Sequence, residues 1–220
     1  MTPLRIAIPK GRLQTPSLAL LEEAGLPIPG TEDLASRALR VNRAGFEWIF
    51  VRDADVPVYI QHGAADIGIA GADQLEEQRA DVHQPFDLPF GQCRLMLIGK
   101  EPGAGPVAGR RSTIATKYPQ LAKSRLGSRA SLAEIVTLQG SVELALVLGL
   151  ADYIVDLVET GSTIRANRLE PLELLMNICP RVAVNRESFR FKRTAVREVL
   201  DRLQTVLASP KQRVEIGGAR

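Results

Sequence analysis

Short apolar runs alternate with helix-like stretches along most of the chain. Runs of about four to eight apolar residues, bounded by turn residues, are typical of buried strands. The first run is Leu4–Ile8, and it is followed by a stretch that begins at Thr15-Pro16 and ends at Gly25. Further strands are predicted at Phe46–Val51, Ile67–Ala70, Cys93–Ile98, Ser112–Thr116, Ile135–Leu138, Ala151–Val158, Leu169–Ile178 and Val182–Val184.

Helices are predicted between these strands from their capping residues and their apolar spacing. Thr15 is a typical N-cap, Pro16 suits the first turn, and Gly25 is a typical helix end. The other predicted helices run from Asp55 to Gly63, from about Ala72, over Tyr118–Leu126, over Val142–Leu148 after Gly140-Ser141, and over Glu187–Leu207. Repeated β-then-α units predict an α/β fold with parallel or mixed sheets covered by helices.

Two such β-and-α sets predict two lobes. The stretch QPFDLPFG interrupts the pattern near residues 85–92, and the chain is expected to return through Pro180. Lobe I is therefore predicted from residues 1–90 together with 180–208, lobe II from residues 91–179, and a tail from 209–220. Two crossings between lobes predict a hinge with a cleft, and ligands of such folds bind at the carboxyl ends of strands.

Composition narrows the class of protein. The chain has 220 residues, of which 45% are hydrophobic, enough for one large or two small cores. Its two cysteines, Cys93 and Cys179, and its two histidines, His62 and His83, match no zinc spacing. No apolar stretch reaches the length of a signal peptide or a membrane span, so a cytoplasmic protein with reduced thiols is expected.

The net charge of +3 is unevenly distributed. Residues 181–220 contain ten Lys and Arg against four Asp and Glu, which leaves the rest of the chain at −3. A solvated helix face, an acidic protein partner and a nucleic-acid surface all fit this bias. The last is disfavoured because aromatic interleaving and any known nucleic-acid motif are missing.

The segment VDLVETGSTIRAN, residues 155–167, is the main candidate for chemistry. An apolar strand stops abruptly at Glu159, and Thr160, Gly161, Ser162 and Thr163 follow. Hydroxyls and backbone N–H groups in such a turn can converge on an anion, and a helix opening at Thr163 would add to the attraction. The alternative is an ordinary strand-to-helix turn with Thr163 as its N-cap.

Other candidate residues follow predicted strands of lobe I. Lys10 and Arg12 flank a glycine after Leu4–Ile8, a pattern that suits a phosphate or carboxylate, and Arg52 follows Phe46–Val51. Solvated surface charges, or an ion pair of Arg52 with Asp53 or Asp55, are the alternatives. Small residues between Asp66, Gly71 and Asp73 would let a ligand approach, although helix–strand packing explains them as well.

No nucleophile-and-base set and no metal cage is recognisable in the sequence. Cations, hydroxyls and glycines at strand ends recur instead, and these suit a phosphate-rich substrate that is positioned and stabilised rather than attacked.

Four segments of the chain can be compared with known families: RIAIPKGRL (5–13), VPVYIQHGAADIGIAGADQLEE (56–77), IATKYP (114–119) and GSVELALVLGLADYIVDLVETGSTIRAN (140–167). Together they resemble ATP phosphoribosyltransferase, the first enzyme of histidine biosynthesis. The resemblance implies a two-lobed fold like that of type II periplasmic binding proteins. It also implies transfer of a phosphoribosyl group from phosphoribosyl pyrophosphate to N1 of ATP, with release of pyrophosphate in the presence of Mg2+, which the substrate mainly holds.

The same resemblance implies roles for individual residues. The turn Glu159–Thr163 would grip the 5′-phosphate of phosphoribosyl pyrophosphate, and Glu159 with Asp156 would hold the ribose hydroxyls. Lys10, Arg12 and Arg52 would act on the pyrophosphate, and Asp66, Gly71 and Asp73 on the nucleotide. No role is implied for Arg165.

The length of the chain resembles that of the short form of the family. Short-form enzymes depend on a second subunit, a catalytically inactive relative of histidyl-tRNA synthetase, in a hetero-octamer. Two rival functions are a non-catalytic small-molecule binding module of the same architecture and a nucleic-acid-binding protein that uses the basic C-terminal segment. Salt-dependent binding would distinguish the second rival.

Overall fold

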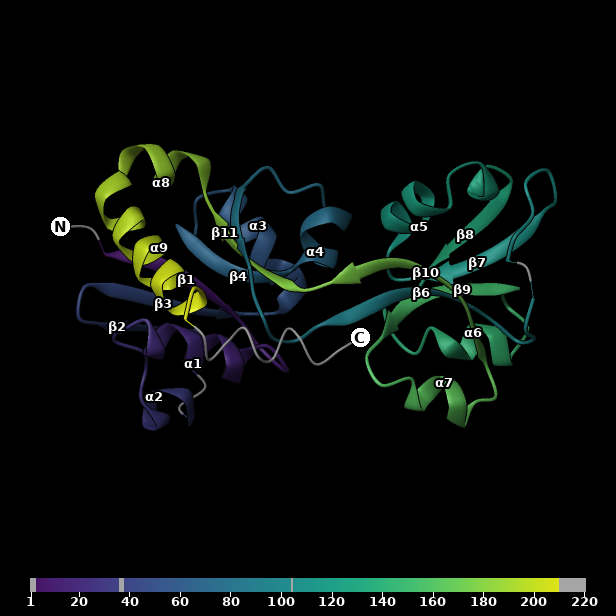
Figure 1. The fold of residues 1–220 in the computed structure, drawn as a ribbon, viewed down its shortest axis with the longest axis horizontal. Coiled ribbons are helices and arrows are strands. Elements are labelled where there is room, and N and C mark those ends of the chain that lie inside the picture. The colour runs from purple at the N-terminus through teal and green to yellow at the C-terminus, as the bar shows by residue number, and fades with distance from the viewer. Residues whose placement is uncertain (1–2, 36–37, 104, 210–220) are drawn as a thin grey trace. The chain divides into compact units, whose positions relative to one another are not determined.

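The computed structural model describes residues 3–35, 38–103 and 105–209, and the chain divides into two compact units (Figure 1). Unit 1 comprises Met1–Gly91 and Cys179–Arg220, and unit 2 comprises Gln92–Ile178. The chain passes between the units twice, and each of these two boundaries lies within one residue of the one expected from the sequence. The tail predicted from 209 onwards lies outside the described residues except for Ser209.

Unit 1 contains a six-stranded mixed sheet in the order β2-β3-β1-β4-β11-β5. Strands β1, β3 and β4 are parallel, whereas β2, β11 and β5 are antiparallel to their neighbours. The strands are β1 (Leu4–Pro9), β2 (Arg40–Arg43), β3 (Phe46–Val51), β4 (Ile67–Gly71), β5 (His83–Asp87) and β11 (Pro180–Val184). The helices are α1 (Gln14–Glu23), α2 (Thr31–Ala35), η1 (Asp53–Asp55), α3 (Val56–Gln61), α4 (Ala72–Glu77), α8 (Arg186–Phe191) and α9 (Arg193–Leu207).

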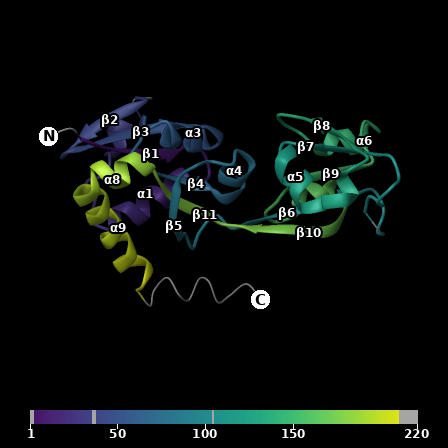
Figure 2. The same cartoon turned by 90° about the horizontal axis from the view of Figure 1, so that it is seen from above.

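The two faces of this sheet bury different residue sizes, because side chains alternate along a strand. Ile6 and Ile8 of β1 pack with α1 and α9 on one face, while Ala7 packs with α3 on the other (Figure 2). Small residues let α3 approach closely. A Cβ at Gly68 would lie 2.8 Å from Ile60 Cδ1 and 2.9 Å from the Ala7 carbonyl oxygen.

The C-terminal helix predicted over 187–207 is two helices. Asn185 caps α8 by accepting a hydrogen bond from the Ser188 backbone N–H at 2.8 Å. The backbone of Lys192 then leaves the helical region, with φ −109° and ψ 29°, so that α9 starts anew at Arg193. The apolar stripe of α9 is buried as predicted, with Val196, Val199, Leu200 and Leu203 inside the core of unit 1.

Unit 2 contains a five-stranded mixed sheet in the order β10-β6-β9-β7-β8. Strand β7 is parallel to β8 and β9, and β6 is antiparallel to β9 and β10. Helices α6 and α7 cover one face and α5 the other (Figure 1). The elements are β6 (Cys93–Gly99), β7 (Ser112–Thr116), α5 (Pro119–Leu126), η2 (Gly127–Ala130), β8 (Ala133–Thr137), α6 (Glu143–Val147), β9 (Tyr153–Val158), α7 (Ser162–Ala166) and β10 (Glu170–Ile178).

Two expectations about unit 1 need correction, and two elements of this unit were not predicted. Helix α1 starts at Gln14 after Leu13, without a side-chain cap, so Thr15 is not its N-cap. The segment expected to interrupt the pattern near 85–92 begins within β5, where Pro85 is tolerated because β5 is an edge strand. The polar strand β2 and the short helix α2 carry too little apolar periodicity to be recognised in the sequence.

Candidate functional site

The hydroxyl-rich turn of unit 2 lies at the carboxyl end of β9. Glu159 and Thr160 are exposed, and Gly161 adopts the left-handed conformation with φ 71°. Helix α7 then starts at Ser162 with Gly161 in the capping position. The predicted helix start at Thr163 is therefore wrong by one position, and the predicted N-cap at Thr163 is wrong by two. The hydroxyls of Thr160 and Ser162 lie 3.1 Å apart and hydrogen-bond to each other.

This turn has the chemistry of an anion-binding nest. Ser162 and Thr163 are exposed in the first turn of α7, where backbone N–H groups lack helical partners. Because α7 has only five residues, its dipole adds little. The amides and hydroxyls of the turn would therefore supply the attraction for a phosphate.

Asp156 lies in the same strand, three residues before the turn. Burial raises the pKa of Asp156, Glu143 raises it further, and the Leu157 N–H bond at 2.9 Å and the charge of Lys117 lower it. Lys117 follows β7, which lies beside β9 with Thr116 opposite Val155. The structure thus adds the cation Lys117, which was not predicted as a site residue although it lies in the segment IATKYP.

Arg165 is a second cation that the structure brings to the turn. A Cβ at Gly161 would lie 3.1 Å from Arg165 Nη1 and 3.7 Å from Val158 Cγ1. Glycine therefore supplies both the left-handed conformation and the space in which this guanidinium lies. The spacing of four residues on one helical turn is the signal that could have predicted the proximity.

The predicted cations of unit 1 follow neighbouring parallel strands. Pro9 at the end of β1 lies opposite Val51 at the end of β3, and the Lys10 N–H donates to the Val51 carbonyl at 2.7 Å. Lys10 and Arg52 thereby leave the sheet at the same edge, and both are exposed. The described residues contain no ion pair between Arg52 and Asp53 or Asp55.

Arg12 is anchored near that edge. Its Nη1 donates to the Gly91 carbonyl at 3.2 Å, and Gly11 before it has φ 90°. Gly91 is the last residue of the first segment of unit 1. Arg12 is an exposed residue.

Gly71 and Asp73 lie at the carboxyl end of β4, where α4 begins. Gly71 is the N-cap of α4, and a Cβ there would clash with Asp73 Oδ1. Asp73 is only 2% exposed. The pKa of nearby Asp53 is raised to about 6, mainly by burial and then by the charge of Asp73. A hydrogen bond from the Gly71 N–H and the charge of Arg12 lower this pKa and only partly offset the rise. Asp53 was not among the residues predicted from the sequence.

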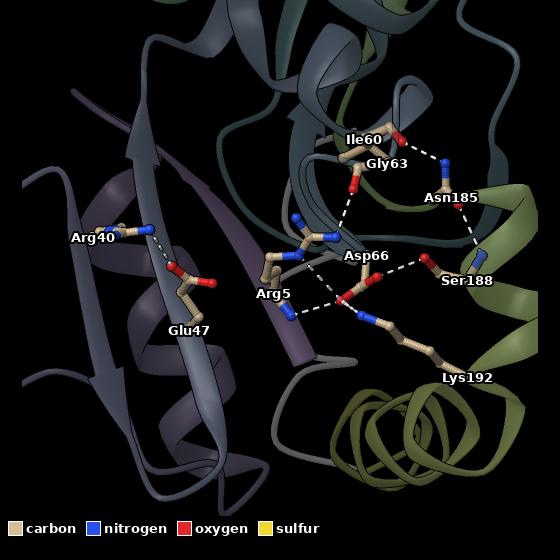
Figure 3. A network of polar contacts seen from close by, with 9 residues as sticks. All are labelled: Arg5, Arg40, Glu47, Ile60, Gly63, Asp66, Asn185, Ser188 and Lys192. Atoms are coloured by element: carbon tan, nitrogen blue, oxygen red, sulfur yellow. Dashed lines mark hydrogen bonds and ion pairs between the residues drawn. The ribbon is translucent and has the colours of Figure 1, made fainter. Parts of the chain in front are cut away.

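Asp66 does not join this group. It precedes β4 at the amino end of the strand, is fully buried, and accepts bonds from Ser188 Oγ at 2.6 Å, Lys192 Nζ at 2.8 Å and the Arg5 N–H at 2.8 Å (Figure 3). The network also includes Asn185, whose Nδ2 donates to the Ile60 carbonyl at 2.7 Å. With both carboxylate oxygens engaged by protein donors, Asp66 joins α8 and α9 to the sheet instead of facing a nucleotide.

The described residues offer neither a metal-binding cluster nor a membrane-spanning helix. Residues 3–35, 38–103 and 105–209 contain no group of three His, Cys, Asp or Glu placed to hold a metal ion. Within the same ranges, no helix is both long and apolar enough to cross a bilayer.

Comparison with known proteins decides between the candidate functions. The profile of the HisG family, described as ATP phosphoribosyltransferase, matches residues 52–205, which run from just before η1 into α9 and include the turn of unit 2. The chain belongs to the ATP phosphoribosyltransferase family. It therefore transfers a phosphoribosyl group from phosphoribosyl pyrophosphate to N1 of ATP, the first step of histidine biosynthesis. The non-catalytic binding module is not favoured.

Individual relatives that are named ATP phosphoribosyltransferase support this assignment. The chain is 44% identical over 205 residues to the ATP phosphoribosyltransferase of Deinococcus radiodurans, covering 93% of this chain and 91% of that relative. It is 36% identical, with a TM-score of 0.79, to a chain of the ATP phosphoribosyl transferase (HisG:HisZ) complex from Thermotoga maritima, covering 93% and 98% of the two chains. Its 220 residues fit the short form of the family.

The predicted periplasmic-binding-protein fold is confirmed as well. The arginine-binding protein of Thermotoga maritima superposes with a TM-score of 0.57 at 15% identity, covering 97% of this chain and 94% of that protein. At this identity the likeness concerns the fold alone. An ATP phosphoribosyltransferase thus shares its architecture with proteins that bind small molecules.

Proposed function

We propose that the turn Glu159–Thr163 holds the 5′-phosphate of phosphoribosyl pyrophosphate in the reaction of this family. The observation that carries the proposal is the exposed, hydroxyl-rich turn at the carboxyl end of β9, with Gly161 in the left-handed conformation. Backbone amides and hydroxyls bind a phosphate without needing to titrate. Arg165 beside Gly161 and Lys117 after β7 add positive charge to the same unit.

Asp156 and Glu159 are proposed to accept hydrogen bonds from the ribose hydroxyls. Asp156 lies half-buried within β9, and Glu159 is exposed directly after the end of that strand. Carboxylates are acceptors when ionised, and two on one strand can meet vicinal hydroxyls. They would orient the sugar, and no covalent role is assigned to either.

Lys10, Arg12 and Arg52 are proposed to bind the pyrophosphate. Breaking the bond between C1 of the ribose and pyrophosphate leaves an oxocarbenium-like sugar and a departing polyanion. Fixed cations stabilise that charge as it develops. N1 of adenine already carries a lone pair, so the attack needs no strong base.

Mg2+ is proposed as the cofactor, held mainly by the pyrophosphate oxygens. The three cations at the edge of unit 1 fit phosphate oxygens and would not themselves bind a metal ion. Mg2+ prefers octahedral oxygen ligands and commonly keeps several waters alongside substrate phosphates. When bound, it would neutralise part of the charge on the leaving group.

Gly71 and Asp73 remain proposed contacts for the nucleotide, since they lie at the carboxyl end of β4. Asp66 is removed from that proposal because its oxygens are engaged inside unit 1.

A regulatory subunit is proposed as the partner. The related Thermotoga maritima protein was solved as a HisG:HisZ complex, which supports a second chain for a short-form enzyme. We further propose that the assembly is a hetero-octamer and works in the cytoplasm, where other biosynthetic enzymes of this kind would act.

Kinetics of arginine variants test the cation assignment. Arg12→Ala and Arg52→Ala should each lower turnover at saturating substrates by about tenfold or more, because a charge-assisted contact is worth roughly 1.5–3 kcal/mol. Arg197→Ala is the control, since Arg197 is an exposed cation on α9. If both variants turn over like the control, Arg12 and Arg52 are surface charges.

A further inference from the structure

Asp53 is a half-buried carboxylate that is incompletely satisfied. It opens η1 directly after β3 and accepts a hydrogen bond from the Gly71 backbone N–H. Its Oδ1 atom is buried, and within the described residues it has no hydrogen-bond partner. A buried acceptor without a donor costs stability, so its presence needs a reason.

A second carboxylate makes the position of Asp53 less favourable. Asp73 is 2% exposed, and its Oδ2 accepts a hydrogen bond from Gln74 Nε2 at 3.1 Å. The negative charge of Asp73 opposes ionisation of Asp53, and the positive charge of Arg12 favours it. Unfavourable placements of this kind are concentrated at functional sites, where charge is arranged for a task other than stability.

We propose that Asp53 is a positioning residue for the pyrophosphate-binding edge of unit 1. Its hydrogen bond to the Gly71 N–H fixes the junction between β4 and α4, and its charge holds the guanidinium of Arg12. The Gly91 carbonyl, at 3.2 Å from Arg12 Nη1, holds the same guanidinium. This inference rests on the proposed role of Arg12.

Protonation of Asp53 should therefore weaken the binding of pyrophosphate at this edge of unit 1. The pKa of Asp53 is raised to about 6, and the charged groups that act on it are Asp73 and Arg12. Below about pH 6 the neutral carboxyl no longer attracts Arg12. Catalytic efficiency with phosphoribosyl pyrophosphate should then decline as the pH falls through this value.

Stability should change in the opposite direction. A carboxyl whose pKa is higher in the folded state than in the unfolded state destabilises the fold when both states are ionised. Replacing Asp53 with a neutral isostere should thus stabilise the protein at pH 8 while lowering its efficiency. A residue with only a structural role would lower both.

The test compares Asp53→Asn with Asp55→Asn as the matched control. Asp55 is an exposed neighbour in η1 whose side chain makes no capping bond to α3. The asparagine at 53 can still accept from the Gly71 N–H, so only the charge is removed. We expect Asp53→Asn to lower kcat/KM for phosphoribosyl pyrophosphate about tenfold at pH 8, to abolish its decline near pH 6, and to raise the melting temperature.

Calorimetric titration of phosphoribosyl pyrophosphate at pH 5 and pH 8 gives a readout that needs no turnover. The affinity of the wild type should fall between pH 8 and pH 5 more than that of Asp53→Asn. An Asp53→Asn variant with wild-type kinetics and binding would overturn the inference, and so would a parallel loss of melting temperature and activity. Absence of turnover in the wild type would instead count against the proposed function, which the binding measurement separates from the role of Asp53.

Discussion

At the scale of single residues, Gly161 is required both for its backbone conformation and for the space beside it. Its φ of 71° is disfavoured for other residues, and a Cβ would crowd the guanidinium of Arg165. The hydroxyls around it have a different status, because Thr163 is exposed on α7 and is not needed to cap it. Substitution of these hydroxyls can therefore separate binding from folding.

Thr163→Ala should weaken phosphoribosyl pyrophosphate binding about tenfold or more while leaving the melting temperature unchanged. The expected loss corresponds to roughly 1.5–3 kcal/mol for a hydrogen bond to a charged group. Calorimetric titration would measure it, with Thr205→Ala on α9 as the control. Equal affinity of the two variants would remove Thr163 from the phosphate site.

Asp66 links stability to pH. Burial alone would raise its pKa, but hydrogen bonds from the Arg5 N–H, Lys192 and Ser188, with the charge of Lys192, lower it overall. A lowered pKa in the folded state stabilises the protein above the ordinary aspartate value of about 4, and this contribution is lost as the pH falls further.

Lys192→Met should lower the free energy of unfolding by about 3 kcal/mol at pH 7, because it removes the cation that is hydrogen-bonded to a buried carboxylate and leaves the more distant Arg5, with Nε 3.9 Å from Asp66 Oδ2, as its ion-pair partner. The deficit should shrink as the pH falls through the lowered pKa of Asp66, where the carboxylate becomes protonated. Urea unfolding at several pH values would follow it, with Arg193→Met as the neighbouring control. A deficit that is independent of pH would contradict the ion-pair account.

Sequence reasoning found residues that follow strand ends and missed those brought in by tertiary contacts. The turn of unit 2 and the cations Lys10, Arg12 and Arg52 directly follow apolar strands in the sequence. They can therefore be predicted without knowledge of the fold. Asp53 can be recognised only from its interactions with Gly71 and Asp73, which are distant in the sequence and close in the fold. Asp66 was predicted as a nucleotide contact because it is close in sequence to Gly71. The two residues in fact lie at opposite ends of β4.

At the scale of elements, apolar runs were sufficient to predict the central strands. Strand β3 has the predicted bounds, and β4 and β6 are each one residue longer. The edge strand β5 contains Pro85 and little apolar periodicity, so its pairing with β11 could not be inferred. The break between α8 and α9 is likewise invisible, because the apolar spacing of α9 is compatible with one long helix.

Gly68→Ala tests the close approach of α3 to β4. The added Cβ would lie within 3 Å of both Ile60 Cδ1 and the Ala7 carbonyl oxygen, and overpacking of this kind costs about 1–3 kcal/mol. Chemical denaturation should show that loss, whereas Gly140→Ala, with nothing within 4 Å of its Cβ, should be nearly neutral. Similar stability of the two variants would mean that α3 lies further from the sheet.

At the scale of the whole molecule, each unit has its own sheet and its own group of candidate residues. Unit 2 carries the turn that is proposed for the 5′-phosphate, and unit 1 carries the cations that are proposed for pyrophosphate. The division into units could be expected because the β-and-α pattern occurs twice. The proposed partner subunit could be expected only from the family, since no surface of the described residues identifies it.

Feedback inhibition tests the proposed partner. Inhibition needs a second site whose ligand favours one global state, and we assign no such site to these units. The isolated chain should therefore be weakly active and insensitive to histidine, as followed by product formation during a histidine titration. Strong inhibition of the isolated chain at low histidine would place an effector site within it and contradict this expectation.

The central claim is tested most directly by pyrophosphate release from ATP and phosphoribosyl pyrophosphate. The chain, with and without a regulatory subunit of the HisZ type, should release pyrophosphate only when both substrates and Mg2+ are present. Phosphoribosyl-ATP should form in equal amount, and Arg12→Ala should reduce both products together. No release with either form of the enzyme, or release without ATP, would contradict the assignment.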